Sequence, residues 1–155
     1  MKTIDHLREL YLYNEWANQR IAASLSQNDC ERALQIFAHL LTTELEYFER
    51  IGGKDSTLFN FWPDLNVIDC GELLKSTSTK YIGLLDKCGD EALDKPITYK
   101  NSRGVQFTNT LEEILTHVLM HSAIHRGNII LKLRESGFEP PQTDYIIYLR
   151  GKKKN

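Results

Sequence analysis

Three histidines follow one another at intervals of four residues in the stretch HVLMHSAIHRG, residues 117–127. Four residues advance an α-helix by about 400°, so His121 and His125 lie nearly one above the other, roughly 6 Å apart. Two imidazoles at this spacing can bind one divalent cation, as in the helical HExxH pair, although the glutamate of that motif is absent here. His117 falls at the edge of the same helical face. A metal site would therefore need at least one further ligand from another part of the chain.

The same pair also has a structural interpretation, in which the rings are hydrogen-bonded groups of the core or of an interface. A buried nitrogen without a partner costs about 1–3 kcal/mol, so several buried imidazoles favour a shared purpose, either a metal ion or a polar network. The spacing does not decide between the two. His39 is the single histidine of the second predicted helix and lies at the margin of its apolar arc, where an adjacent helix could bring the pair close to it.

Four long segments show the three-and-four spacing of apolar residues that is typical of amphipathic helices. All four prolines of the chain fall outside these segments, as expected because proline is poorly tolerated inside a helix. Each helix must bury its apolar stripe against neighbours, which predicts an all-α four-helix bundle. We expect a single domain over residues 1–150, followed by a basic tail over residues 151–155. The predicted helices are residues 4–25, 31–51, 69–89 and 110–137.

Polar residues at the beginning of three of these segments match the capping-box pattern. In a capping box, the first side chain and a carboxylate three residues later each bond the other's backbone N–H. The pattern therefore marks where a helix starts. The matches are Asn28 with Glu31, Asp69 with Glu72, and Thr110 with Glu113.

Two connections between the helices are more than simple turns. Residues 97–100 and 105–108 alternate with period two around the turn 101–104, which predicts a short β-hairpin before the last long helix. Residues 53–68 form a connection that is long for a compact domain, and their three aromatic residues indicate that it packs onto the bundle. We expect this connection to plug the end of the bundle, with a substrate lid as the alternative.

Composition and charge narrow the class of protein. The chain of 155 residues is long enough for one core and too short for two ordinary domains. Its formal charge of -2 offers no basic surface for nucleic acid, and it has neither an apolar stretch of about 18 residues nor a leader-like start. Three cysteines without metal spacing fit reduced thiols. We therefore expect a cytoplasmic protein that binds no nucleic acid and no membrane.

Four sequence segments carry a family resemblance when they are taken together: YNEWANQRI at 13–21, AHLLTTELEYFERI at 38–51, HVLMHSAIHRGNI, and the later PPQTDYIIYL. In this order they resemble the DinB family, also called DinB/YfiT-like proteins. The HxxxHRGN end of the histidine row is close to the HxxxHRGQ usual in the family, with Asn128 in place of glutamine. The resemblance implies a homodimer of four-helix bundles, each with a divalent metal held by three histidines. The implied ligands are His39, His121 and His125.

Two charged residues fall on or beside the predicted apolar faces. Glu44 matches a position where the family often has glutamate, and an unpaired carboxylate in the apolar arc of its helix would be costly. We expect Glu44 to accept a hydrogen bond from His6 or a tyrosine, or to pair with an arginine, with a partly exposed charge as the alternative. Arg126 projects away from His121 and His125 on the helical wheel, so we expect a surface or helix–helix ion pair.

Three further residues are candidates for the surroundings of the metal. His117 matches a position where family members have histidine, and we expect it to be a helix-edge or pocket residue instead of a ligand. Asn14 and Trp16 could line the pocket, and the alternative for both is packing in the core or at a dimer contact. No side chain is identified as the general base, so the catalytic residues are left open.

The chemistry expected of such a site follows from its open coordination. Three histidine ligands leave a position for water or substrate, as in catalytic zinc sites, and imidazole suits both Zn²⁺ and Ni²⁺. An ion of this kind is a Lewis acid. The resemblance implies either a metal-dependent hydrolase or an S-transferase that uses a low-molecular-weight thiol, acting on an unidentified small-molecule substrate. The alternative function is a stress-related metal-binding dimer without turnover.

Overall fold

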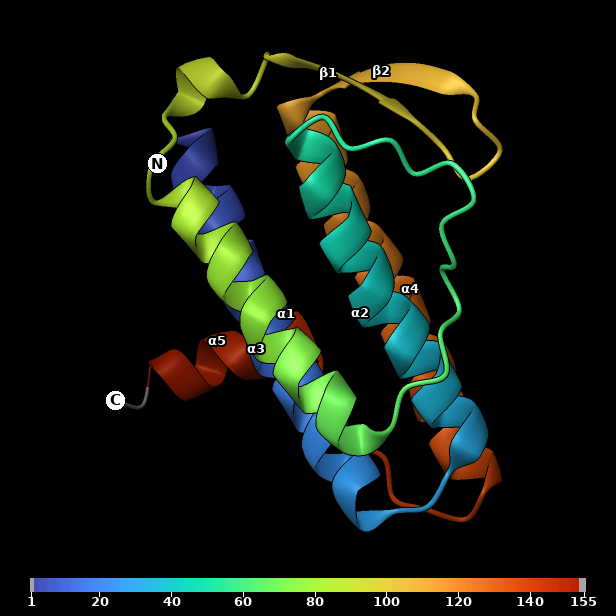
Figure 1. Cartoon of the computed structure of the whole chain (residues 1–155). Helices are drawn as coiled ribbons and strands as arrows, with labels where there is room; N and C mark the ends of the chain where they lie inside the picture. Colours follow the sequence, from blue (N-terminus) through green and yellow to red (C-terminus); the bar gives the residue numbers. More distant parts are fainter. Residues whose placement is uncertain (1, 154–155) are drawn as a thin grey trace.

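Four long helices lie side by side in the computed structural model, which describes residues 2–153 (Figure 1). They confirm the predicted all-α bundle, and each begins and ends close to the boundaries expected from the apolar spacing. The helices are α1 (Thr3–Gln27), α2 (Glu31–Ile51), α3 (Val67–Leu85) and α4 (Leu111–Glu135).

The apolar stripes of the four helices form two buried clusters, one toward each end of the bundle. The cluster nearer the β-hairpin contains Tyr11, Tyr81 and Leu115. The cluster at the opposite end contains Phe37 and Ile129. The two are separated along the helices, and buried polar residues such as Asn14, Asn18 and Glu44 lie between them.

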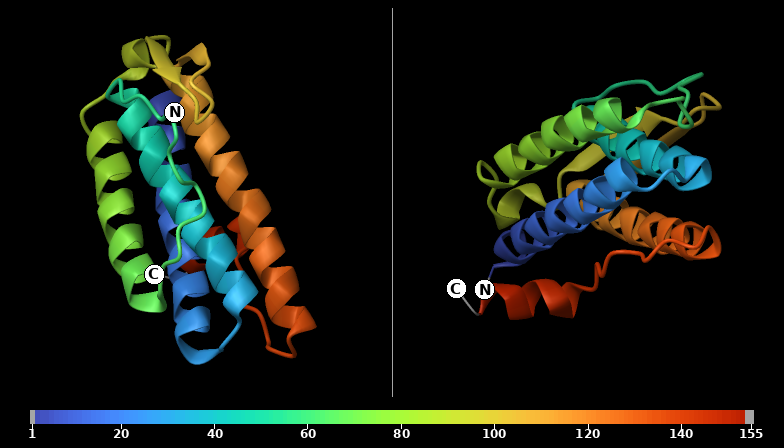
Figure 2. Two further views of the ribbon diagram at one scale, coloured as in Figure 1. Left: turned by 45° about the vertical axis from the view of Figure 1, so that its right-hand side comes forward. Right: turned by 90° about the horizontal axis from the view of Figure 1, so that it is seen from below.

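The helices α2 and α3 run in the same direction, whereas α1 and α4 run the opposite way (Figures 1 and 2). Contacts are made between α2 and α4, α1 and α3, α2 and α3, and α1 and α4. The helix α2 ends at one end of the bundle and α3 begins at the other end. Residues 52–66 must therefore run along the bundle instead of across its end. The expected bundle-end plug is therefore wrong: two consecutive parallel helices require a long crossover connection.

Capping boxes start two of the helices. Thr110 caps α4 as predicted, since its side chain accepts from the backbone N–H of Glu113, whose own side chain accepts from that of Thr110. The start of α3 lies earlier than predicted, because the capping pair is Asn66 with Asp69. Asp69 is thus the acidic partner of the capping box and not its first residue.

The expected capping role of Asn28 in α2 is wrong. Its side chain donates a hydrogen bond to the carbonyl of Ser24 at 2.9 Å, so Asn28 closes the end of α1. Cys30 is the residue before α2 and makes no side-chain capping bond. An asparagine between two helices satisfies either a free N–H or a free C=O, and here the C=O of the preceding helix is nearer.

A two-stranded antiparallel sheet precedes α4, as predicted. It consists of β1 (Pro96–Lys100) and β2 (Gln106–Thr110), and a short 3₁₀ helix, η1 (Asp90–Ala92), links α3 to it. The crossover connection bonds this hairpin, because the N–H of Ser56 donates to the carbonyl of Lys100. The hairpin thus holds the first part of residues 52–66 at the end of the bundle.

A fifth helix, α5 (Tyr145–Lys152), was not predicted from the sequence. It lies across the outside of α1, where the Tyr148 hydroxyl and the Lys152 ammonium both donate to Glu9, at 2.9 and 2.7 Å. Part of the expected basic tail therefore belongs to this helix, while residues 154–155 lie outside the described residues. None of the described helices combines the length and the apolar character needed to cross a membrane.

The importance of the apolar clusters can be measured at Leu115, which is fully buried. Leu115→Ala removes buried methyl groups and leaves a cavity, so the free energy of unfolding should fall by about 2–5 kcal/mol. Urea denaturation followed by circular dichroism measures this change. Ile68→Ala on α3 is the control, since Ile68 is 74% exposed and its loss should cost less than about 0.5 kcal/mol. Equal losses in the two variants would contradict the assigned core.

Candidate metal centre

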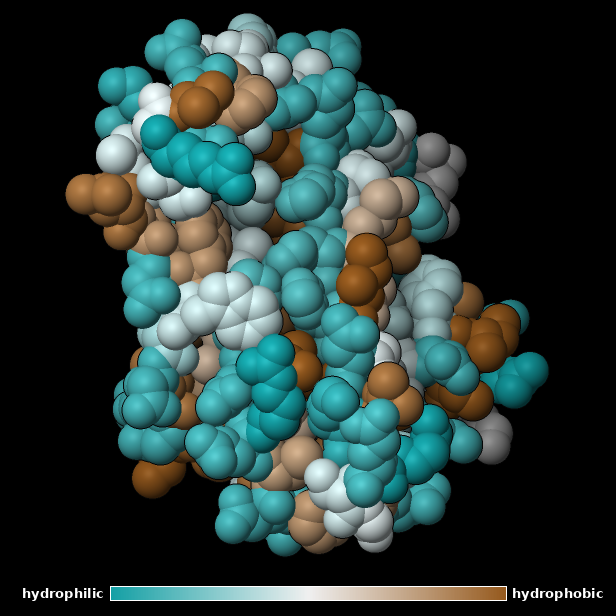
Figure 3. Space-filling view, turned by 90° about the vertical axis from the view of Figure 1, so that its right-hand side faces the viewer, coloured by the Kyte–Doolittle hydropathy of each residue, from teal (hydrophilic) through white to brown (hydrophobic). Residues whose placement is uncertain are grey.

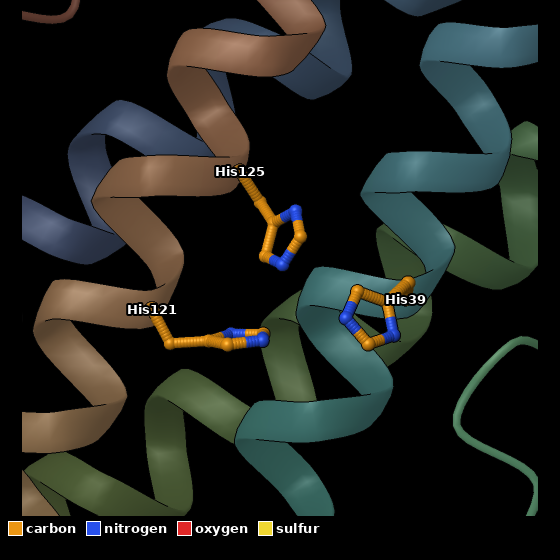
Figure 4. Close-up of side chains that lie close together, drawn as sticks. All are labelled: His39, His121 and His125. Atoms are coloured by element: carbon orange, nitrogen blue, oxygen red, sulfur yellow. The ribbon is translucent and has the colours of Figure 1, made fainter.

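The side chains of His39, His121 and His125 converge between α2 and α4 (Figure 4). One ring nitrogen from each residue lies within 4.8 Å of the other two. The ring centroids are 5.2 Å apart for His39 and His121, 4.7 Å for His39 and His125, and 4.4 Å for His121 and His125. Two nitrogens on one zinc ion are at most about 4.2 Å apart, so small ring rotations suffice to fit a shared ion. We call these three residues the histidine group.

The orientation of His39 is set by the crossover connection. Its Nδ1 lies 2.6 Å from the carbonyl oxygen of Phe61, and this contact requires the Nδ1–H tautomer if the ring is neutral. The other nitrogen, Nε2, then carries the lone pair and is directed toward the two histidines of α4 (Figure 4). Trp62 stacks on the imidazole ring of His39, with ring centroids 3.8 Å apart and an interplanar angle of 3°. A second hydrogen bond that fixes tautomer and ring orientation is typical of metal-binding histidines.

Burial keeps the histidine group neutral. It lowers the pKa of His121 to about 3, an effect increased by the neighbouring His125 and His39. Burial is also the main cause of the lowered pKa values of His39 and His125. Within the described chain, the buried Nδ1 atoms of His121 and His125 have no hydrogen-bond partner. At neutral pH all three rings can therefore offer a lone pair, which is the form that binds a metal.

An open pocket of about 290 Å³ borders the histidine group at His125. Trp62, the residue that stacks on His39, forms part of its wall, and His125 is the member of the group that lines it directly. This hollow gives a small molecule access to the space beside the ligands. We call it the His125 pocket; it is lined by Arg32, Ile36, Trp62, His125, Asn128, Leu131 and Lys132.

Comparison with known proteins identifies the family. The model of the DinB family matches residues 1–155. The chain belongs to the DinB family. Protein DinB of Bacillus subtilis (strain 168) is 29% identical over 164 aligned positions, covering 94% of each protein. The uncharacterized protein YizA of the same organism is 25% identical over 135 positions, covering 84% of this chain and 83% of YizA.

A solved structure shows the same fold. The crystal structure of the DinB-like protein YjoA from Bacillus subtilis matches with a TM-score of 0.65 and 20% sequence identity. The match covers 90% of this chain and 98% of YjoA. At this identity the likeness concerns the arrangement of the helices.

His117 lies outside the histidine group. Its ring packs against Tyr47 with centroids 4.9 Å apart, while its centroid is 5.9 Å from that of His121. It lines a separate pocket of about 140 Å³ together with Tyr99 and Glu113. His117 therefore lines a neighbouring pocket and lies apart from the three converging histidines.

Glu44 is buried, with 3% of its surface exposed, and the expected partners of its side chain were wrong. Its Oε1 accepts hydrogen bonds from the amides of Asn14 and Asn18, at 2.7 and 3.1 Å. The Ser122 hydroxyl donates to the same oxygen at 2.7 Å. His6 is exposed on α1, and no tyrosine or arginine of the described chain bonds the carboxylate directly. Polar residues placed within the apolar stripes of α1 and α4 supply the donors instead.

Arg126 is also buried, and no carboxylate of the described chain pairs with it directly, so the expected surface or helix–helix ion pair is wrong. Its Nη1 donates to the side-chain oxygens of Asn14 and Asn18, at 2.6 and 2.9 Å. Each asparagine therefore accepts a hydrogen bond from the Arg126 guanidinium and donates one to the Glu44 carboxylate. The two amides thus link two opposite charges. We call this set the polar layer: Asn14, Asn18, Glu44, Ser122 and Arg126.

The structure does not bring the two pocket candidates of α1 to the histidine group. Asn14 is part of the polar layer. Trp16 packs against Tyr148 of α5, with ring centroids 5.5 Å apart, and beneath the guanidinium of Arg20. The residues that sequence reasoning missed are Phe61 and Trp62, and the aromatic content of their long connection was the available signal.

The polar layer predicts a large effect of neutralising Glu44. Glu44→Gln leaves the buried Arg126 without its negative counterpart, and breaking a buried charge pair costs about 3–5 kcal/mol. We expect a loss near the lower end of this range, measured by urea denaturation, because the asparagines still bond the guanidinium. Glu49→Gln on the same helix is the control, since Glu49 pairs with Lys80 at a half-exposed position worth less than about 1 kcal/mol. Similar losses would contradict the layer's role.

The stack of Trp62 on His39 predicts a fluorescence signal for metal binding. In a Trp16→Phe background, Trp62 is the remaining tryptophan of the chain. Ni²⁺ is an open-shell ion that quenches a nearby excited indole, so titration should give a saturable loss of Trp62 emission. Zn²⁺ should restore the emission by competition. Quenching of the same strength after His39→Ala would show that Ni²⁺ binds elsewhere.

Proposed function

We propose that the histidine group binds a divalent cation and that the protein is a metal-dependent enzyme acting at that ion. The observation that carries the proposal is the convergence of three neutral imidazoles from two helices within 4.8 Å. The hydrogen bond from His39 to the Phe61 carbonyl supports it, because it directs the free nitrogen toward the other two rings. Imidazole ligands suit zinc, nickel, copper and iron alike, and zinc and nickel are the two ions that we propose.

Access to the site supports a catalytic role over a purely structural one. Structural zinc sites are closed by four protein ligands, whereas catalytic sites keep a position for water or substrate. The histidine group supplies three ligands, and the His125 pocket opens beside one of them. When bound, the ion would supply Lewis-acid chemistry toward water, a carbonyl or a thiolate.

The side chains of the chain favour a nucleophile that comes from outside the protein. Cys30 contacts Ser136 and the Lys132 carbonyl, and Cys70 is buried in the apolar cluster of the same end. Ser122 donates to Glu44 and so is held in the polar layer. The proposed reactions are therefore hydrolysis, with water as the nucleophile, or transfer of a low-molecular-weight thiol to an electrophile.

Metal content tests the ligand assignment. Purified wild-type protein, grown in supplemented medium without nickel-affinity purification, should contain about one divalent ion per chain by elemental analysis. Loss of an outer hydrogen-bond partner already lowers metal affinity roughly 10–100-fold, so His121→Ala should lower it by more than about 100-fold. His6→Ala is the control, because His6 is exposed on the first turn of α1. Metal-free wild type, or retention by His121→Ala, would overturn the assignment.

Turnover is tested separately with the metal-loaded protein. Bacterial low-molecular-weight thiols with an electrophile are assayed beside a panel of esters and amides, and product formation should disappear in His121→Ala. A metal-loaded protein that turns over none of these substrates would favour the non-catalytic alternative.

A further inference from the structure

The His125 pocket joins a cationic end to the histidine group. Arg32 precedes His39 by seven residues on α2, and Lys132 follows His125 by seven residues on α4. Seven residues are two helical turns, about 10.5 Å along the axis. Because α2 and α4 are antiparallel neighbours, both cations lie at the same end of the pocket, away from the histidines.

Arg32 is the cation of this pocket that has no carboxylate partner within the described chain. Its guanidinium bonds the side-chain oxygen of Gln35 at 3.0 Å and lies 5.5 Å from the centre of the Trp62 ring. Lys132 by contrast is paired with Glu135 at 2.7 Å. A guanidinium held against an aromatic face presents its remaining N–H groups in the fork geometry that binds a carboxylate.

Apolar side chains line the pocket between its two ends. Ile36 is buried, while Leu131 and Trp62 are each 48% exposed. Figure 3 shows the side of the molecule that carries α2, α4 and the crossover connection, where hydrophobic side chains appear as separate patches among hydrophilic ones. A volume of about 290 Å³ is at the lower limit of roughly 300–1,000 Å³ for ligand pockets, which points to a small ligand.

We propose that the His125 pocket binds a small carboxylate with a short apolar chain, its carboxylate on Arg32 and its other end at the histidine group. This inference names the substrate class and so rests on the proposed function for its catalytic meaning. The binding itself needs no metal, because Arg32 and the apolar wall belong to the protein. Arg32 and Trp62 also line a neighbouring hollow together with the carboxylates of Glu31 and Asp64. Neither carboxylate forms an ion pair with Arg32 in the described chain.

Hexanoate, hexanol and hexylammonium test the pocket, since they share a chain and differ in charge. Binding to the full chain is followed by two-dimensional NMR, with and without zinc. Hexanoate should bind most tightly and shift the resonances of residues around Ile36 and Leu131. Arg32→Gln should weaken it about tenfold, the loss expected for one hydrogen bond to a charged group. Arg134→Gln makes the same charge change at an exposed site and should alter binding less than about twofold.

The outcomes separate this inference from the proposed metal site. Equal binding of hexanoate and hexanol, or equal effects of Arg32→Gln and Arg134→Gln, would overturn the carboxylate pocket while leaving metal binding intact. Hexanoate binding that requires zinc and is unaffected by Arg32→Gln would place the carboxylate on the ion, which also overturns the pocket. Hexanoate binding that depends on Arg32, in a chain that takes up no metal, would support the carboxylate pocket and overturn the metal site.

Discussion

The buried contact between Glu44 and Arg126, carried by two asparagines, is the constraint on which the rest of the bundle depends. It lies between the two apolar clusters and bonds α1, α2 and α4 to one another. Apolar side chains tolerate a sliding of one helix against another, whereas a buried charge without its partner is expensive. The polar layer therefore fixes the register of three helices at the level where the histidines meet.

The polar layer also positions the histidine group. Ser122 and Arg126 directly follow His121 and His125, so the two turns of α4 that carry the histidines are each bonded to the layer. On α2, Glu44 lies just over one turn beyond His39 and points to the interior while His39 faces α4. The same turns of helix therefore carry both the histidines and the residues of the polar layer that bond the helices together. This arrangement leaves the imidazoles little freedom to move apart.

The helices and the hairpin could be predicted from the sequence because apolar spacing is a local property. The hydrogen-bond partners of the buried polar side chains could not, because they depend on which helix lies opposite. The four helices, the hairpin and the convergence of α2 and α4 histidines were expected. A helical wheel directed Arg126 away from the histidines, but it could not show that α1 would lie there with two asparagines. The short helix α5 was missed because its contacts, such as that of Lys152 with Glu9, join distant parts of the chain.

The topology of the bundle also explains why a connecting segment takes part in the site. A connection between antiparallel helices would stay at one end, but the parallel α2 and α3 require residues 52–66 to travel back along α2. The backbone of such a segment has carbonyls to satisfy, and that of Phe61 meets the His39 imidazole. Trp62 then covers the ring and contributes a wall to the His125 pocket. The crossover that the helix directions impose is therefore the element that orients His39 and shapes the approach to it.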